Sequence, residues 1–292
     1  MANSTLSAIL LFRWYYYRRG SGYNHWSEQN ISSIEFVILC LVVVGVLALA
    51  YYTITKRIEN RSRPGAKAIK AIEPLSGIHR SVLSEKSDYY NKLSKTHKEL
   101  FEKRVRHYMS TKMFTTEDGY AITDEMKVMI SAAACQITFG LPLMGNSTYT
   151  HILIMPNGNM QPKTASQSNT IVVPWKEFVD GYAQSDDGQN EGLKVMAMAL
   201  IRDNRLQSKG YKFFAEKKYS KWEKISVQEA ETFMSGMFQN METDERQGDE
   251  YFALAVVYFF ELPVAFKHKY PVLFDVMADL LGQDTIKRTI SS

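Results

Sequence analysis

The stretch Gly192-Leu-Lys-Val-Met-Ala-Met-Ala-Leu-Ile-Arg-Asp203 decides how the fold of this chain is interpreted. Its apolar residues recur at helical spacing, and an acidic, glycine-containing loop, residues 185–190, precedes it. A helix is therefore predicted from this loop to about Arg205. Between Met196 and Leu200 the side chains are thioether or aliphatic and offer no good ligand for a zinc ion. This helix is predicted to belong to the protein core.

Length and composition fit one globular domain with additional segments. The chain has 292 residues, and 45% of them are hydrophobic. The net charge of +4 comes from 35 basic and 31 acidic residues that are mostly intermixed, so no nucleic acid is expected as a partner. Cys40 and Cys135 have no partner at metal-site spacing. Both are predicted to be small buried hydrophobes in a reducing compartment.

The N-terminal part is predicted to attach the protein to a lipid bilayer. Residues 1–33 form an aromatic and basic tail of the kind that suits the headgroup region. Residues 34–54 contain an uncharged apolar run, which as a helix would span about 28 Å. A transmembrane helix is therefore predicted over residues 34–54. A cleaved signal peptide is the alternative, but the run is too long and begins too far from Met1.

Flanking charge predicts the orientation of this helix. More basic residues follow the apolar run than precede it, and this excess favours a cytoplasmic C-terminal part. Residues 55–94 contain proline, glycine and scattered charge, which predicts a basic juxtamembrane linker resting on anionic lipid. The basic residues that follow the run are Lys56, Arg57, Arg61, Arg63, Lys67 and Lys70.

The remaining chain is predicted to be α+β, mainly helical with a small central sheet. Two segments rich in β-branched residues, Tyr149 to Met155 and Thr170 to Trp175, are predicted to be strands. The predicted helices are one from about Tyr90 to Met109, one that Thr123 caps and Gly140 ends, one begun by the capping box Ser226 to Glu229, one over Asp249 to Phe260, and one that Pro263 begins and Gly282 ends.

Several segments, in the correct order and spacing, resemble the MtfA family of zinc-dependent peptidases, which are related to the Mlc titration factor. They are Val172 to Gly181, the acidic loop, the helix that ends in Asp203, and Glu250 to Pro263. The resemblance implies a zincin-like metallopeptidase domain over residues 95–284 and a C-terminal tail over 285–292. It also implies that the predicted anchor lies in a bacterial inner membrane.

The family's central helix reads His-Glu-Phe-Ala-His, and this chain departs from that motif wherever the chemistry needs a donor. Aligned on Ala199 and Asp203, Met196 stands at the first histidine, Ala197 at the glutamate and Leu200 at the second histidine. In the family the two histidines bind zinc and the glutamate polarises the bound water. The resemblance therefore implies vestigial positions, no catalytic residue, no metal ligand on this helix and no zinc cofactor.

The family's third zinc ligand is a glutamate on the following helix. Glu250 and Val257, seven residues apart, occupy the two positions where the family carries glutamates. Glu250 is either a remnant ligand or a first-turn acid that favours the helix dipole. A zinc site elsewhere would have to be assembled from histidines that are scattered singly along the chain, namely His25, His79, His97, His107, His151 and His268.

Two functions from different classes follow from this resemblance. The first is a membrane-anchored pseudopeptidase that binds or regulates a protein partner, as the family's namesake sequesters a transcriptional repressor. The second is an active zinc-dependent (amino)peptidase with an unusual or relocated metal site, built from Glu250, Glu261 and a histidine. A third interpretation is a structural protein of the membrane surface that spaces or oligomerises its partners.

Overall fold

A computed structural model describes residues 33–61, 72–116, 119–141, 147–156, 169–207, 212–235 and 245–290. The chain divides into two compact units, Met1–Arg57 and Ile58–Ser292. In the first unit the described residues belong to helix α2 (Ser33–Arg61). The predicted aromatic tail, apart from Ser33, lies outside the described residues.

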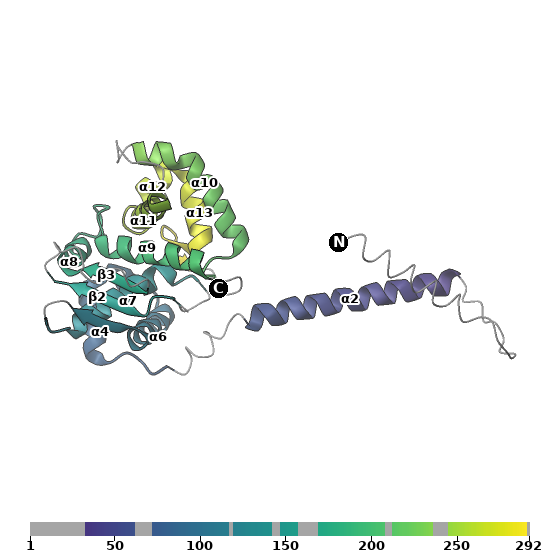
Figure 1. Ribbon diagram of the computed structural model, residues 1–292, viewed down its shortest axis with the longest axis horizontal. Coiled ribbons are helices and arrows are strands. Elements are labelled where there is room, and N and C mark those ends of the chain that lie inside the picture. The colour runs from purple at the N-terminus through teal and green to yellow at the C-terminus, as the bar shows by residue number, and fades with distance from the viewer. Residues whose placement is uncertain are drawn as a thin grey trace. The chain divides into compact units, whose positions relative to one another are not determined.

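Helix α2 covers the apolar run that the sequence analysis assigned to a membrane (Figure 1). Many of its apolar side chains are exposed, including Leu41, Val44 and Leu49. Cys40 is exposed among them, so the prediction that it is buried is wrong. In the ranges that the structure describes, we find no helix with both the length and the apolar character needed to cross a membrane. The structure therefore does not support the transmembrane helix predicted over residues 34–54.

The second unit contains a parallel three-stranded sheet. Its strands β1 (Met113–Thr116), β2 (His151–Met155) and β3 (Thr170–Pro174) lie in that order. β2 and β3 form where the sequence analysis predicted strands. β1 was not predicted, because its four residues alternate between exposed and half-buried and carry no apolar run. Parallel neighbours need a crossover connection, and helix α7 (Asp124–Thr138) lies between β1 and β2 in the chain.

Helix α7 is buried on two faces. Ile130 and Ala133 belong to the main hydrophobic core, whereas Ala132 and Cys135 belong to a second core cluster. Small side chains permit this close packing on both faces. Burial raises the pKa of the Cys135 thiol to about 12, as expected for a structural cysteine. The predicted N-cap is confirmed, because the Met126 amide donates to the Thr123 hydroxyl at 3.2 Å.

Part of the segment predicted as a linker is folded onto α7. Residues 55–94 contain α4 (Gly77–Lys86) and α5 (Asp88–Asn91), which bury Leu83 and Tyr90 in the second core cluster. Helix α6 (Lys95–Thr111) completes this layer. The linker prediction is therefore wrong for these two helices. The scattered charges in this segment are typical of a linker, although its apolar residues have helical spacing.

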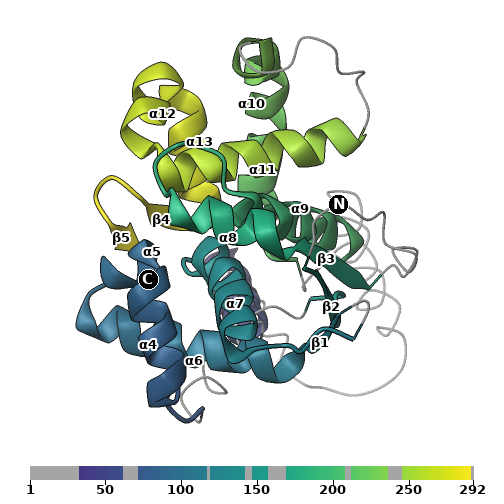
Figure 2. The same ribbon diagram turned by 90° about the vertical axis from the view of Figure 1, so that its left-hand side faces the viewer.

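The C-terminal half is helical, as predicted, and Figures 1 and 2 show α9 between two layers: the sheet with α7 on one side and α10 to α13 on the other. The helices are α8 (Trp175–Ala183), α9 (Glu191–Leu206), α10 (Glu216–Ser235), α11 (Glu245–Glu261), α12 (Pro263–Lys269) and α13 (Pro271–Leu281).

The predicted helix start at Ser226 is wrong. Ser226 lies inside α10, where its hydroxyl donates to the carbonyl of Glu223 at 2.9 Å. The helix begins ten residues earlier, at Glu216, and Trp222 anchors that first half in the core. A capping box is a local pattern, and tertiary packing of the preceding turns overrides it here.

The predicted signals near the C-terminus are confirmed in part. Pro263 occupies the first turn of α12, and Gly282 ends α13 in the left-handed conformation at φ +63°. A Cβ atom on Gly140 would lie 2.2 Å from the Gly282 carbonyl oxygen, so the two backbones touch. Beyond this contact β4 (Gln283–Asp284) pairs antiparallel with β5 (Thr289–Ile290). The segment predicted as a tail, residues 285–292, thus includes a hairpin strand.

Candidate functional site

Helix α9 is fixed at its N-terminus by a single side chain. Asn190 is the N-cap residue, and its Oδ1 accepts a hydrogen bond from the Leu193 amide at 2.8 Å. Its Nδ2 donates to the Gly181 carbonyl at 3.1 Å and to the Glu261 carboxylate at 2.9 Å. Asn190 therefore joins the start of α9 to the end of α8 and to the end of α11.

The three vestigial positions on α9 are packed in the core. Met196 is 3% exposed, Ala197 0% and Leu200 7%, and all three belong to the main hydrophobic cluster. Met196 and Leu200 line a cavity of only about 60 Å³, which they share with His107 and Tyr149. Such a volume suits one or two water molecules rather than a peptide. These side chains therefore fill the face of α9 to which the resemblance assigns the family's motif.

The two candidate positions for the third ligand differ in burial. Val257 is buried in the core, where α11 packs against α9. Glu250 is half-buried and lies in the second turn of α11, because the helix begins at Glu245. The interpretation of Glu250 as a first-turn acid is therefore wrong. As a remnant ligand it stays a prediction.

Asp249, next to Glu250, forms a buried ionic contact with α9. Its side chain is 4% exposed, and its two oxygens lie 2.7 Å from the Arg202 Nε and 2.5 Å from an Arg205 guanidinium nitrogen. Arg202 follows the vestigial motif by two residues. These ion pairs clamp the C-terminal part of α9 to α11.

Asp203, the family residue used for the alignment, has a structural role here. It is buried, and its carboxylate accepts hydrogen bonds from the Thr148 amide at 3.0 Å and the Thr148 hydroxyl at 2.8 Å. Gln207 donates a further bond at 3.2 Å. The contacts attach the end of α9 to the segment that leads into β2.

The donors present on α9 and α11 do not fit a zinc ion. Zinc sites in proteins use histidine, cysteine and carboxylate ligands, usually three or four of them. The facing positions here supply Met196, Leu200 and Val257, which leave Glu250 as a single carboxylate. Across the described part of the chain, no three His, Cys, Asp or Glu side chains form a group that could hold a metal ion.

The other histidines and glutamates do not rescue a metal site at this place. Glu250 and Glu261 lie at different ends of α11, about 16 Å apart along the helix axis. His79 pairs with Asp124 at 3.3 Å, and His151 interacts with the Thr150 hydroxyl at 2.9 Å. Burial and the nearby Lys112 lower the pKa of His107. His25 lies outside the described residues.

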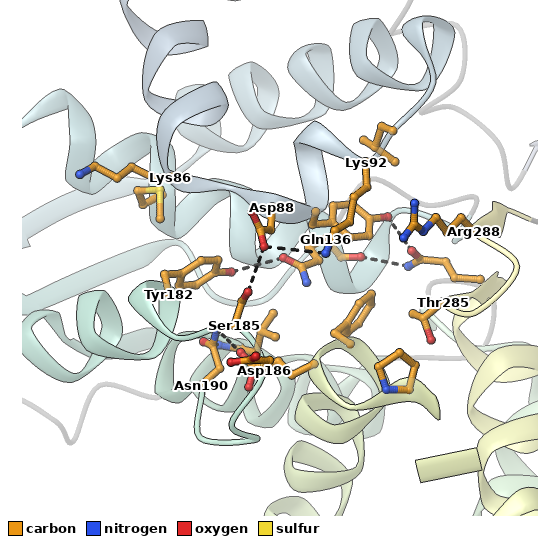
Figure 3. Close-up of a pocket in the computed structure, with 18 of the residues that line it drawn as sticks. Lys86, Asp88, Lys92, Gln136, Tyr182, Ser185, Asp186, Asn190, Thr285 and Arg288 are labelled. Atoms are coloured by element: carbon orange, nitrogen blue, oxygen red, sulfur yellow. Dashed lines mark hydrogen bonds and ion pairs between the residues drawn. The ribbon is translucent and has the colours of Figure 1, made fainter. Parts of the chain in front are cut away.

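A much larger cavity, of about 1120 Å³, opens at the other end of α9 and α11. We call it the polar cavity (Figure 3). Its walls come from α5, α7, the loop between α8 and α9, the end of α11, and the β4–β5 hairpin. Ser185 donates a hydrogen bond to Asp88 at 3.0 Å and so joins α5 to the loop across it. Residues that line it include Asp88, Gln136, Tyr182, Asp186, Glu261 and Arg288.

Glu261 is the most perturbed acid that lines the polar cavity. Burial raises the pKa of its carboxyl group to about 7, nearby Asp187 adds to this, and the hydrogen bonds from Asn190 and Gly188 oppose it. The Gly188 amide donates to Glu261 at 3.1 Å from a backbone at φ +74°, a conformation that favours glycine. The loop before α9 therefore wraps around this carboxylate.

A small parallel sheet, a mainly helical second half and a central helix buried between them form an α+β fold, which fits a metallopeptidase domain. The chain belongs to the glucose-regulated metallo-peptidase M90 family, whose model matches residues 60–211. This confirms the resemblance to MtfA. The match includes α9 with its vestigial positions and ends before α11.

A relative from Synechocystis sp. (strain ATCC 27184 / PCC 6803 / Kazusa) has no assigned function. That uncharacterized protein is 20% identical to this chain over 231 residues, which cover 70% of this chain and 83% of the relative. The similarity extends over more of the chain than the family match does.

The sequence analysis did not predict the polar cavity. Glu261 was considered only as a ligand of a relocated metal, and Gln136 and Asn190 were not considered as site residues. The acidic loop before a predicted helix was the available signal, because it places Asn190 at an N-cap. Its contact with Glu261 joins residues 71 positions apart and was not visible in the sequence.

Proposed function

We propose that this M90-family protein has lost metal binding and peptide hydrolysis and acts by binding a protein partner. The observation that carries the proposal is the burial of Met196, Ala197 and Leu200 as apolar core residues on α9. These are the positions where the family's motif supplies two zinc ligands and a general base. Without those groups the helix can stabilise the fold, but it cannot activate water.

Partner binding is supported by the contrast between the two cavities. The space beside the vestigial positions holds about 60 Å³, whereas the polar cavity holds about 1120 Å³. Pockets of several hundred Å³ are the usual size for ligand recognition. The polar cavity is thus large enough for a bound group, whereas the space beside Met196 and Leu200 is not.

The experiment is a joint measurement of metal content and hydrolysis on the purified full-length chain. We expect less than stoichiometric zinc by elemental analysis and no chelator-sensitive cleavage of peptide substrates. Bound zinc together with hydrolysis would contradict the proposal and favour the active peptidase. In that case Glu250→Gln is the informative variant, since unchanged activity would remove Glu250 from the ligand set.

We also infer that α2 attaches the protein to a membrane. The inference is supported by exposed apolar side chains such as Val42, Val46 and Leu47 on α2, which need an apolar partner to be stable. The test is sedimentation of the full-length chain with vesicles. A variant with Val42, Val46 and Leu47 replaced by lysine should stay in the supernatant, and equal sedimentation of both proteins would contradict the inference.

A further inference from the structure

We propose that the polar cavity binds an extended polypeptide segment by accepting a lysine or arginine side chain against Glu261. The inference rests on the proposed function, because it names the kind of partner that a binding protein of this fold would take. Four observations carry it: the size of the cavity, a carboxylate without a cation, an amide donor on the wall without an acceptor, and the distribution of charge around the walls.

Glu261 lacks the cation that a half-buried carboxylate normally has. Its described hydrogen bonds come from neutral groups, the Asn190 amide at 2.9 Å and the Gly188 backbone amide at 3.1 Å. No lysine, arginine or histidine among the described residues forms an ion pair with it. Asp249, on the same helix, has two arginines. A cationic side chain from a partner would supply to Glu261 what Asp249 already has.

Gln136 supplies a second recognition element on the cavity wall. The residue is 6% exposed, and its Oε1 accepts a hydrogen bond from the Tyr182 hydroxyl at 3.5 Å. Its Nε2 donates to none of the described residues and is not one of the fully buried unpaired atoms, so it is available to donate to a bound group. Figure 3 shows Gln136 and Tyr182 together at the cavity. The carbonyl oxygen of a bound peptide is an acceptor of the required kind.

The charges around the cavity favour a basic guest. Asp88 and Asp186 are exposed acids that line it, and the Asp88 carboxylate is only loosely paired with Lys92 at 3.8 Å. Arg288 has no ion-pair partner among the described residues, and Figure 3 places it across the cavity from Asp186. The acidic side lies near Asn190, which donates to Glu261. A basic side chain is therefore directed toward Glu261 and away from Arg288.

The experiment uses two fluorescently labelled nonapeptide libraries that are identical except for a central arginine or a central glutamine. Binding to the full-length chain is followed by fluorescence anisotropy. We expect the arginine library to bind at least about tenfold more tightly. In Glu261→Gln this preference should fall by about fivefold to tenfold, since the carboxylate is replaced by a neutral isostere.

Two further variants keep the result interpretable. Arg288 lines the same cavity. Arg288→Ala should keep the preference for the arginine library, because it removes a positive charge that repels a bound arginine. Gln136→Met should weaken both libraries by a similar factor, because it removes a donor to the peptide backbone. Equal binding of the two libraries, or an unchanged preference in Glu261→Gln, would overturn the proposal.

The outcome is separable from that of the proposed function. Metal content and hydrolysis are measured on the same preparation. A protein with zinc that cleaves peptides and still prefers arginine would contradict the loss of catalysis but support the site. A protein without zinc and without a preference would contradict the site alone.

Discussion

The two ends of helix α11 carry acids with different surroundings, a buried Asp249 and a half-buried Glu261. Near the start of the helix, Asp249 is held by Arg202 and Arg205 from α9. Twelve residues later, about 18 Å along the axis, Glu261 meets the amides of Asn190 and Gly188 and faces the polar cavity. The Asp249 end is held by ion pairs within the protein, whereas the Glu261 carboxylate has no ion pair among the described residues and lies beside the polar cavity.

The polar cavity therefore lies at the Glu261 end of α11, whereas the Asp249 end is packed. The closed part includes the positions of the vestigial motif, whose apolar side chains fill the core. Apolar side chains at Met196, Ala197 and Leu200 stabilise the fold, because buried polar groups without partners would cost free energy. An unpaired carboxylate costs free energy too, and its position beside a cavity supports the binding role that we propose.

The largest expected effect comes from restoring the family's acid at the closed end. Ala197→Glu should reduce the free energy of unfolding by about 3 to 5 kcal/mol, because the carboxylate would enter a fully buried site without a partner. Urea denaturation followed by tryptophan fluorescence measures it. Ala215→Glu, at an exposed position, should change stability by no more than about 0.5 kcal/mol. A stable Ala197→Glu protein would show that this face is an open cleft.

Breaking the ion pairs at the same end should have the second largest effect. Asp249→Asn should lower the free energy of unfolding by about 2 kcal/mol, because two arginines lose the negative charge that pairs with them, although partial exposure of those arginines moderates the loss. The same denaturation assay applies. Asp279→Asn, whose carboxylate pairs with Lys218 at the surface, should cost less than about 1 kcal/mol. Equal losses in the two variants would mean that Asp249 does not clamp α9.

At the cavity end the bridging residue is expected to matter less. Asn190→Ala should lower the free energy of unfolding by about 1 to 2 kcal/mol, because α9 loses its N-cap and Glu261 loses a donor. Asn190→Ser keeps a capping hydroxyl but not the bond to Glu261. The serine variant should therefore lose about half as much free energy of unfolding as the alanine variant. Equal losses in both variants would mean that the whole effect comes from the hydrogen bond between Asn190 and Glu261.

The last comparison concerns the pH dependence of stability rather than stability at one pH. The pKa of Glu261 is raised to about 7 in the folded protein from an ordinary value of 4.5. The folded state therefore binds more protons than the unfolded state between these two values, and stability contributed by the protonated group is lost as pH rises toward 7. In Glu261→Gln this decline should be absent. Parallel stability profiles across that range for both proteins would contradict the raised pKa.

Local signals in the sequence predicted several elements correctly. Thr123 caps α7, Pro263 begins α12, and Gly282 ends α13, because each acts through its own backbone geometry or an adjacent amide. Strands β2 and β3 followed from β-branched residues. The signals that failed were those that packing overrides: the capping box at Ser226 lies within α10.

The sequence by itself determined what chemistry the central helix lacks, since the side chains of Met196, Ala197 and Leu200 include no good zinc ligand and no general base in any conformation. It also determined the family resemblance, through motifs in the correct order. Only the tertiary structure decided which carboxylates on α11 are compensated. The partners of Asp249 and Glu261 come from segments more than 40 residues away in the chain, so their pairing depends on how α9 packs against α11.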